Sequence, residues 1–104
     1  MTKVHISRDA ATELEQAARW YERESPGLGG RLVDAFEHAI GLLRGKMPPL
    51  LPVDGTSGMK GAKRIILRRF PFSVIVIQRS DEYLIIALAH HSRKPGYWQE
   101  RIRT

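Results

Sequence analysis

The side chains best suited to chemistry lie toward the two ends of one stretch, residues 63–98. They are basic or aromatic, and they fall where predicted strands end and side chains could converge: Arg68, Arg69, His90, His91, Arg93, Lys94 and Tyr97. Such groups suit cleavage of a phosphodiester, because a 2′-hydroxyl must lose a proton, the leaving oxygen must gain one, and the negative transition state needs cationic donors. Histidine can make either proton transfer, and tyrosine can stack on a base or donate a proton.

The same residues also have a purely structural interpretation. Arginines on an antiparallel sheet commonly mark its solvated face, and Tyr97 with Trp98 can serve packing alone. His90 and His91 are adjacent on a predicted strand, so they should face opposite ways and at most one should enter a given site. No spacing of His, Asp and Glu predicts a metal site, and no cofactor is expected. The absence of cysteine excludes disulfides and thiol chemistry.

Three runs rich in Ile, Val, Leu and Phe predict the strands that would position these groups: residues 64–70, 72–78 and 83–91. Pro71 marks a bend after the first run, and the polar residues 79–82 predict a hairpin turn after the second. We therefore expect an antiparallel meander. Strict alternation puts five side chains of the last run on one face: Tyr83, Ile85, Ala87, Ala89 and His91.

The first half of the chain predicts helical cover for that sheet. Lys3–Ile6 could add an edge strand, and Ser7 then occupies an N-cap position before an amphipathic helix over residues 9–24. Pro26 and three glycines predict a turn, followed by a second helix over residues 30–46. The buried stripe of that helix should be Leu32, Phe36, Ala39, Ile40 and Leu43, whereas the first helix should turn Glu13, Glu15, Gln16, Arg19, Glu22 and Arg23 to solvent.

The remaining segments are predicted to be irregular. Residues 50–62 are expected to form a loop, because Gly, Pro, Ser and Thr dominate them. Residues 97–103 could form one or two helical turns, with Trp98 and Ile102 covering the sheet edge and Arg101 in water.

Length and composition favour one domain over residues 1–104, and no apolar run reaches the roughly 20 residues that a membrane helix needs. We therefore expect a cytoplasmic protein with no membrane partner. The net charge of +6 is unevenly spread. Residues 1–58 hold 7 Lys/Arg and 8 Asp/Glu, whereas residues 59–104 hold 10 and 3. The positive field of the second half suits phosphate backbones, acidic protein segments or anionic surfaces, although a basic balance taken alone favours a surface that serves only solubility.

Three segments together resemble the RelE/ParE superfamily of toxins from type II toxin–antitoxin modules: LEQAARWYERESPGLGGRLVDAFEHAI, RRFPFSVIV and ALAHHSRKPGYW. The resemblance covers nearly the whole chain. It implies an α+β fold in the order β-α-α-β-β-β, with a short N-terminal strand and a helix hairpin packed on an antiparallel sheet and room for a short C-terminal helix. It also implies a cognate antitoxin whose disordered segment folds along the toxin, and operator DNA bound through the antitoxin complex.

The superfamily divides by target. RelE-like members are endoribonucleases that cut mRNA in the translating ribosome, whereas ParE-like members inhibit DNA gyrase and lack that catalytic set. The nucleases carry basic residues on the first meander strand, an arginine on the second, and a basic residue and a tyrosine or histidine after the last. Arg64, Arg93 and Tyr97 match this pattern, whereas Ile66 and Ser73 stand where a lysine and the second-strand arginine are common.

Three hypotheses follow from the resemblance. The chain is a growth-arresting gyrase inhibitor, which the missing arginine slightly favours, a ribosome-dependent mRNA endoribonuclease, or an inactive member that binds only its antitoxin. The nuclease would use Arg64, Arg68, Arg93, Tyr97 and His91 as its catalytic set. Contact with a target or nucleic acid would involve Lys60, Lys63, Arg69, His90 and Lys94.

Overall fold

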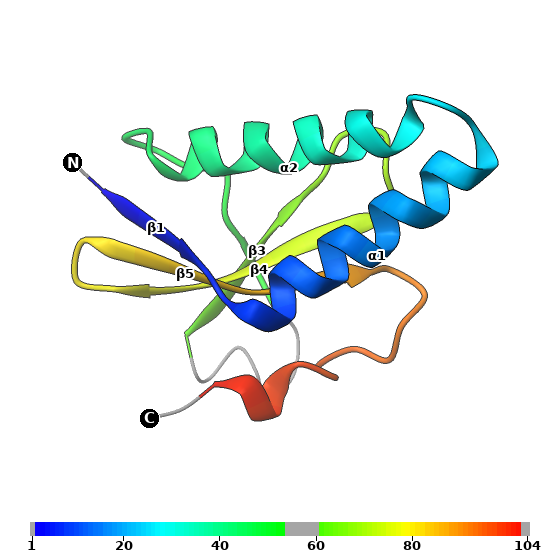
Figure 1. Cartoon of the computed structure of the whole chain (residues 1–104). Coiled ribbons are helices and arrows are strands. Elements are labelled where there is room, and N and C mark those ends of the chain that lie inside the picture. Colours follow the sequence, from blue (N-terminus) through cyan, green and yellow to red (C-terminus); the bar gives the residue numbers. More distant parts are fainter. Residues whose placement is uncertain (1, 54–60, 103–104) are drawn as a thin grey trace.

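The computed structural model describes residues 2–53 and 61–102, in which two helices cover one face of a five-stranded sheet (Figure 1). In chain order the elements are β1 Lys3–Ile6, α1 Arg8–Glu24, α2 Leu28–Leu43, β2 Leu51–Pro52, β3 Ala62–Ile66, β4 Phe72–Arg79, β5 Glu82–His90 and the 3-10 helix η2 Gln99–Arg101. The predicted α+β class is confirmed. No helix in the described ranges is long and apolar enough to cross a membrane.

The start of each helix is fixed by a side-chain cap. The Ser7 hydroxyl oxygen accepts a hydrogen bond from the Ala10 amide at 3.1 Å, so α1 begins close to its predicted position. α2 begins two residues earlier than predicted, because the Glu22 carboxylate accepts hydrogen bonds from the amides of Gly27 and Gly29 at 2.8 and 3.0 Å. These bonds satisfy two amides at the start of a helix. Glu22 is therefore a cap for α2 as well as a residue of the exposed face.

The two helices pack closely at Gly29. A β-carbon at this position would lie 2.4 Å from the Ala18 carbonyl oxygen, far inside van der Waals contact, whereas one at the neighbouring Gly30 would meet nothing within 4 Å. α2 then ends at Leu43, three residues before its predicted end, as the Arg44 amide bonds back to the Ile40 carbonyl and the chain turns.

The sheet has the strand order β1-β5-β4-β3-β2. The meander β3-β4-β5 is antiparallel as predicted, but β1 runs parallel to β5, from Lys3 beside Glu82 to Ile6 beside Ile85. The predicted edge strand is therefore present, and its direction, which the sequence left open, makes the sheet mixed; the chain leaves β1 toward α1, which crosses the sheet (Figure 1). Within the predicted loop, β2 adds a two-residue strand beside β3, and residues 54–60 lie outside the described part of the chain.

The first predicted meander strand is too long. β3 ends at Ile66, and the chain turns over Arg68 and Arg69, with Arg69 in the left-handed region at φ 67°. The Leu67 amide donates to the Phe72 carbonyl at 2.9 Å and closes this turn. The apolar pattern extends to Phe70 because Leu67 and Phe70 still pack in the core, although the strand itself has ended.

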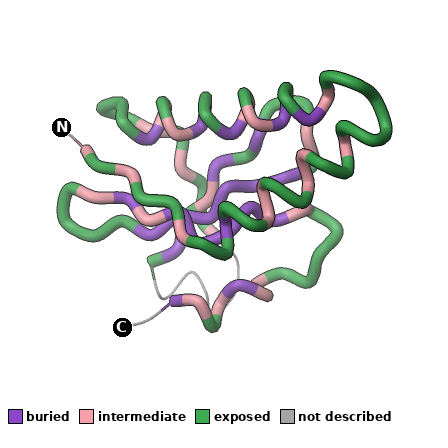
Figure 2. The backbone as a smooth tube through the Cα atoms, viewed as in Figure 1, coloured by how far each residue is buried: buried purple, intermediate pink, exposed green. Residues whose placement is uncertain are grey.

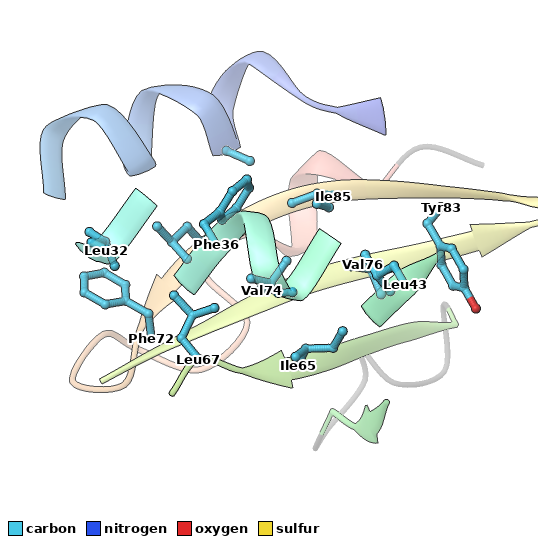
Figure 3. Close-up of a cluster of buried hydrophobic side chains, with 13 residues drawn as sticks. Leu32, Phe36, Leu43, Ile65, Leu67, Phe72, Val74, Val76, Tyr83 and Ile85 are labelled. Carbon is cyan, nitrogen blue, oxygen red and sulfur yellow. The ribbon is translucent and has the colours of Figure 1, made fainter. Parts of the chain in front are cut away.

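Apolar side chains form a core on each face of the sheet. In Figure 2 the buried residues follow the central strands and recur along α2. Between the helices and the sheet lie buried side chains from α2 and from all three meander strands, including Leu32, Phe36, Leu43, Val74 and Ile85 (Figure 3). Four of the five residues of the predicted α2 stripe are buried, and Ile40 is half-buried. On the opposite face, Trp98 and Ile102 pack on the sheet with Ile75, Ile77 and Ile86. The C-terminal segment therefore covers a face of the sheet rather than its edge.

A β-bulge in β5 breaks the predicted alternation. Ile75 lies opposite Ala87 but Val76 lies opposite Ile85, so Ile86 is the extra residue. As a result Ile86 and Ala87 both join the second core, and Leu88 joins the first. The prediction that Ala87 shares a face with Ile85 is wrong for this reason. The bulge also sets which way the end of β5 faces, and the candidate site is built there.

Candidate functional site

A pocket of about 190 Å³ lies where β5 ends and the chain turns toward η2. Strands β3 and β4 supply one side of it, and the segment after β5 supplies the other. Its lining residues are Val53, Arg64, Ser73, Ile75, Ala89, His90, His91, Arg93, Lys94, Pro95, Gly96, Tyr97 and Trp98. None of these described lining residues is acidic, so the pocket is suited to an anion.

Arg64 is the cationic side chain that reaches the pocket from the sheet. Its Nε atom is buried and has no hydrogen-bond partner among the described residues. A buried donor without a partner costs free energy, which an incoming acceptor would recover. Arg64 is therefore the residue of the pocket best prepared to receive an oxyanion.

Both histidines line the pocket, contrary to the prediction that only one could. The strand ends at His90, so His91 no longer obeys strand alternation. The His91 Nε2 atom lies 2.9 Å from the hydroxyl oxygen of Ser73, which is buried in β4. His90 packs edge-to-face on Phe72, and its Nδ1 atom accepts a hydrogen bond from the Ser92 amide at 3.0 Å. Each ring is thus held in place by a different neighbour.

Four residues, two of which line the pocket, form a connected polar group that we call the Glu13 cluster: Glu13, Arg93, Tyr97 and Arg101. The Tyr97 hydroxyl donates to Glu13 at 2.5 Å, and Arg101 donates to the same carboxylate at 2.8 Å. The Arg93 guanidinium lies over the Tyr97 ring, 3.7 Å from its centroid, with its nearest nitrogen 3.9 Å from Glu13. The cluster therefore holds two residues of the pocket, Arg93 and Tyr97, against α1.

The Glu13 cluster exists because β1 is short. Strand β1 ends at Ile6, so β5 has no strand partner on that side beyond Ile85. Glu13 accepts a hydrogen bond from the Leu88 amide at 3.1 Å, and Arg101 donates to the Ile86 carbonyl at 3.0 Å. Two side chains thus replace the missing strand and satisfy backbone groups that would otherwise be unpaired.

The sequence predictions for Glu13 and Arg101 were wrong, since both were expected in solvent. The Glu13 side chain is only 14% exposed, and Arg101 is partly buried against it. One signal was available in the sequence: Glu13 lies three residues after Ala10 and four before Ala17, which puts it in line with the apolar stripe. The partner of that carboxylate, 84 to 88 positions later, could not be read from the same pattern.

The cluster shifts two pKa values. Burial, followed by the hydrogen bond and the negative charge of Glu13, raises the pKa of Tyr97 well above its ordinary value, although Arg101 and Arg93 oppose the shift. Burial works against the charged form of Arg101, but the hydrogen bond and charge of Glu13 outweigh it and raise the pKa of Arg101. Tyr97 therefore keeps its proton, and Arg101 its charge, throughout the neutral range.

Tyr97 is accordingly expected to resist ionisation at alkaline pH. Because its folded-state pKa is raised, it stabilises the fold fully below its ordinary pKa of about 10 and loses this contribution as the pH rises beyond that value. Ultraviolet titration of the folded protein and of Tyr97→Phe should differ by a tyrosine that ionises above pH 10, and the variant should lose less stability at high pH. A difference spectrum that titrates near pH 10 would contradict this assignment.

The remaining predicted site residues lie elsewhere. Arg68 and Arg69 line a separate hollow near the helices and do not reach the Arg64 pocket, and Lys63 is exposed on β3. Lys60 lies outside the described residues. Within residues 2–53 and 61–102, no group of three or more His, Asp or Glu side chains could hold a metal ion.

Comparison with known proteins gives a structural likeness. No protein-family model matches the chain, and no curated protein matches it significantly. A chain of a solved structure described as "Chromosomal ParDE TA system from P. aeruginosa" superposes with a TM-score of 0.71 at 19% identity, covering 86% of this chain and 96% of that one. The fold implied by the sequence resemblance is therefore confirmed.

Proposed function

We propose that this chain is the toxin of a type II toxin–antitoxin module, restrained by a cognate antitoxin, and that it arrests growth by binding DNA gyrase in the ParE manner. The likeness to a chain of the ParDE system, over almost the whole of that chain, supports the toxin assignment. Operator DNA would be bound by the complex with the antitoxin. Fold alone does not decide the target, so the choice of gyrase rests on how Tyr97 is held by Glu13.

The hydrogen bond from the Tyr97 hydroxyl to Glu13 is the observation that favours gyrase binding over RNA cleavage. A catalytic tyrosine must exchange a proton with the reacting oxygens. Here the hydroxyl already donates to Glu13, its pKa is raised, and Arg93 covers the ring. The second-strand arginine of the nucleases is also absent, and the buried Ser73 stands in that region. These residues are arranged to hold the C-terminal segment in place.

Ribosome-dependent cleavage of mRNA is the second candidate. It is favoured by the Arg64 pocket, whose described lining residues include no Asp or Glu. Arg64 offers an unpartnered buried donor, and Arg93 and Lys94 add positive charge around a space that suits a phosphate. His91 would then transfer the proton, with Ser73 fixing its ring. In this mechanism Tyr97 positions Arg93 and does not itself react.

Inducing the chain in cells and mapping new mRNA 5′ ends separates the two candidates. For a gyrase inhibitor we expect growth arrest with intact mRNA, and purified protein should trap gyrase in cleaved supercoiled DNA. Arrest should survive His91→Gln and Tyr97→Phe, since neither change removes much contact area. Translation-dependent cuts at a fixed codon position, abolished by His91→Gln, would overturn the proposal in favour of the nuclease. Absence of both arrest and cuts would indicate a member that only binds its antitoxin.

A further inference from the structure

We infer that the chain carries a second ligand site, for single-stranded nucleic acid, in the hollow beside the β3–β4 turn. This hollow of about 580 Å³ shares no lining residue with the Arg64 pocket. It is lined by Tyr21 of α1, by Leu28, Arg31, Asp34 and Ala35 of α2, and by Arg68, Arg69 and Phe70 of the turn. The inference goes beyond the proposed function and does not depend on it.

Three arginines from two separate parts of the chain supply the charge. Arg31, Arg68 and Arg69 are all exposed, and none of them has an ion pair or a hydrogen bond from its side chain to another described residue. Asp34 is the acidic residue in the lining, and it pairs with none of the three. Guanidinium groups that are left unpaired around a concave surface are suited to phosphate oxygens, which they can bind through two parallel hydrogen bonds.

The backbone at Arg69 strengthens this argument. Its φ of 67° lies in the left-handed region, which glycine and asparagine adopt readily and which costs other residues conformational free energy. Strained residues of this kind are concentrated at ligand-binding positions. At the tip of the turn, Arg68 and Arg69 therefore present two adjacent cations.

Aromatic rings beside the arginines favour nucleic acid over an acidic polypeptide. Tyr21 packs edge-to-face on Phe70 at a centroid distance of 5.3 Å, and Trp20 packs in the same way on Tyr21 at 5.0 Å. Trp20 is nevertheless 51% exposed. The rings of Tyr21 and Phe70 line the hollow with the arginines, and the exposed indole contacts Tyr21. Together they offer stacking surfaces for unpaired bases and charges for their phosphates. Carboxylates of an acidic peptide would use only the arginines, and a duplex would hide its base faces.

Trp20 also provides the measurement, because the second tryptophan, Trp98, is only 3% exposed. The full-length protein would be titrated with a single-stranded oligothymidylate of about ten nucleotides while tryptophan fluorescence is followed at several salt concentrations. We expect saturable quenching whose affinity falls with salt. Removing an arginine that contacts phosphate should lower affinity about threefold to tenfold and reduce the salt slope by about 0.7.

The variants are chosen so that loss of folding cannot explain loss of binding. Arg69→Asn removes the charge but keeps a residue that tolerates the left-handed conformation, and Arg68→Ala and Arg31→Ala test the other two cations. Trp20→Leu, followed by fluorescence anisotropy of a labelled oligonucleotide, should weaken binding about tenfold. Arg44→Ala, an exposed arginine after α2, is the matched control, and Arg64→Ala tests the other pocket.

Four results would overturn the inference. These are absence of quenching, equal or tighter binding of poly-glutamate, tighter binding of duplex DNA, and binding that Arg64→Ala abolishes but Arg69→Asn leaves intact. None of them bears on the proposed function, because growth arrest, mRNA cutting and gyrase trapping are scored without reference to this hollow. Conversely, failure of the toxin assignment would leave the titration unchanged.

Discussion

Replacing Glu13 with alanine is expected to lower the free energy of unfolding by about 3 kcal/mol, because it breaks a largely buried ionic group. The change leaves the Leu88 amide without its acceptor and the Tyr97 hydroxyl with the longer contact to the Leu88 carbonyl, at 3.5 Å. It also removes the nearer counter-charge of Arg101, whose other carboxylate partner, Asp9, lies at 3.8 Å. Urea denaturation followed by circular dichroism gives the free energy directly. The pKa of Tyr97 should also move back toward its ordinary value, which the ultraviolet titration would show.

Glu15→Ala is the matched control for this experiment. Glu15 lies two positions further along α1, and its ion-pair partner among the described residues is the exposed Arg19. The Glu15 side chain is itself 60% exposed. Its loss should change stability by no more than about 0.5 kcal/mol. Glu13→Gln keeps an acceptor of the same shape and should fall between the two. Equal effects of Glu13→Ala and Glu15→Ala would show that the Glu13 cluster does not stabilise the fold.

Gly29→Ala is expected to lower the free energy of unfolding by about 2 kcal/mol, since the added carbon cannot fit between the helices. It would lie 2.4 Å from the Ala18 carbonyl oxygen and 3.0 Å from the Glu22 carboxylate that caps α2. The helices must separate, or the cap must move. The same denaturation experiment measures the loss.

Gly30→Ala, at the next position, is expected not to destabilise the fold. A β-carbon there meets nothing within 4 Å, and the residue lies within α2. Alanine in a helix is favoured over glycine by about 0.5 to 1 kcal/mol, so this variant should be at least as stable as the parent. A loss of stability in Gly30→Ala as large as that in Gly29→Ala would mean that helix contact at Gly29 is not the cause.

Local patterns predicted the framework of this fold well. The 3.6-residue spacing of Leu32, Phe36 and Leu43 defined the buried face of α2, and the β-branched runs defined β4 and β5. These signals work because each element buries its own apolar stripe. The direction of β1 and the two-residue β2 had no local signal, because both depend on which distant strand edge is free.

The candidate site could be predicted only in part, for the same reason. The sequence correctly grouped His90, His91, Arg93, Lys94 and Tyr97, which follow one another along the chain. It also placed Arg68 and Arg69 with them, because β3 was expected to run through both, whereas the strand ends at Ile66. Glu13 was assigned to the wrong environment, since its partners are set by a bulge and by a missing strand neighbour rather than by the helix that carries it.

The parallel edge pair has a consequence for how the protein is made. β1 is synthesised well before its partner β5, and Glu13 is synthesised 84 and 88 positions before its partners Tyr97 and Arg101. Contacts so distant in sequence carry a large cost of loop closure and form late. Chains grow from the N-terminus, so the first strand and helix emerge from the ribosome with an edge and a carboxylate still unpaired. The fold described here can close only after Arg101 has been synthesised.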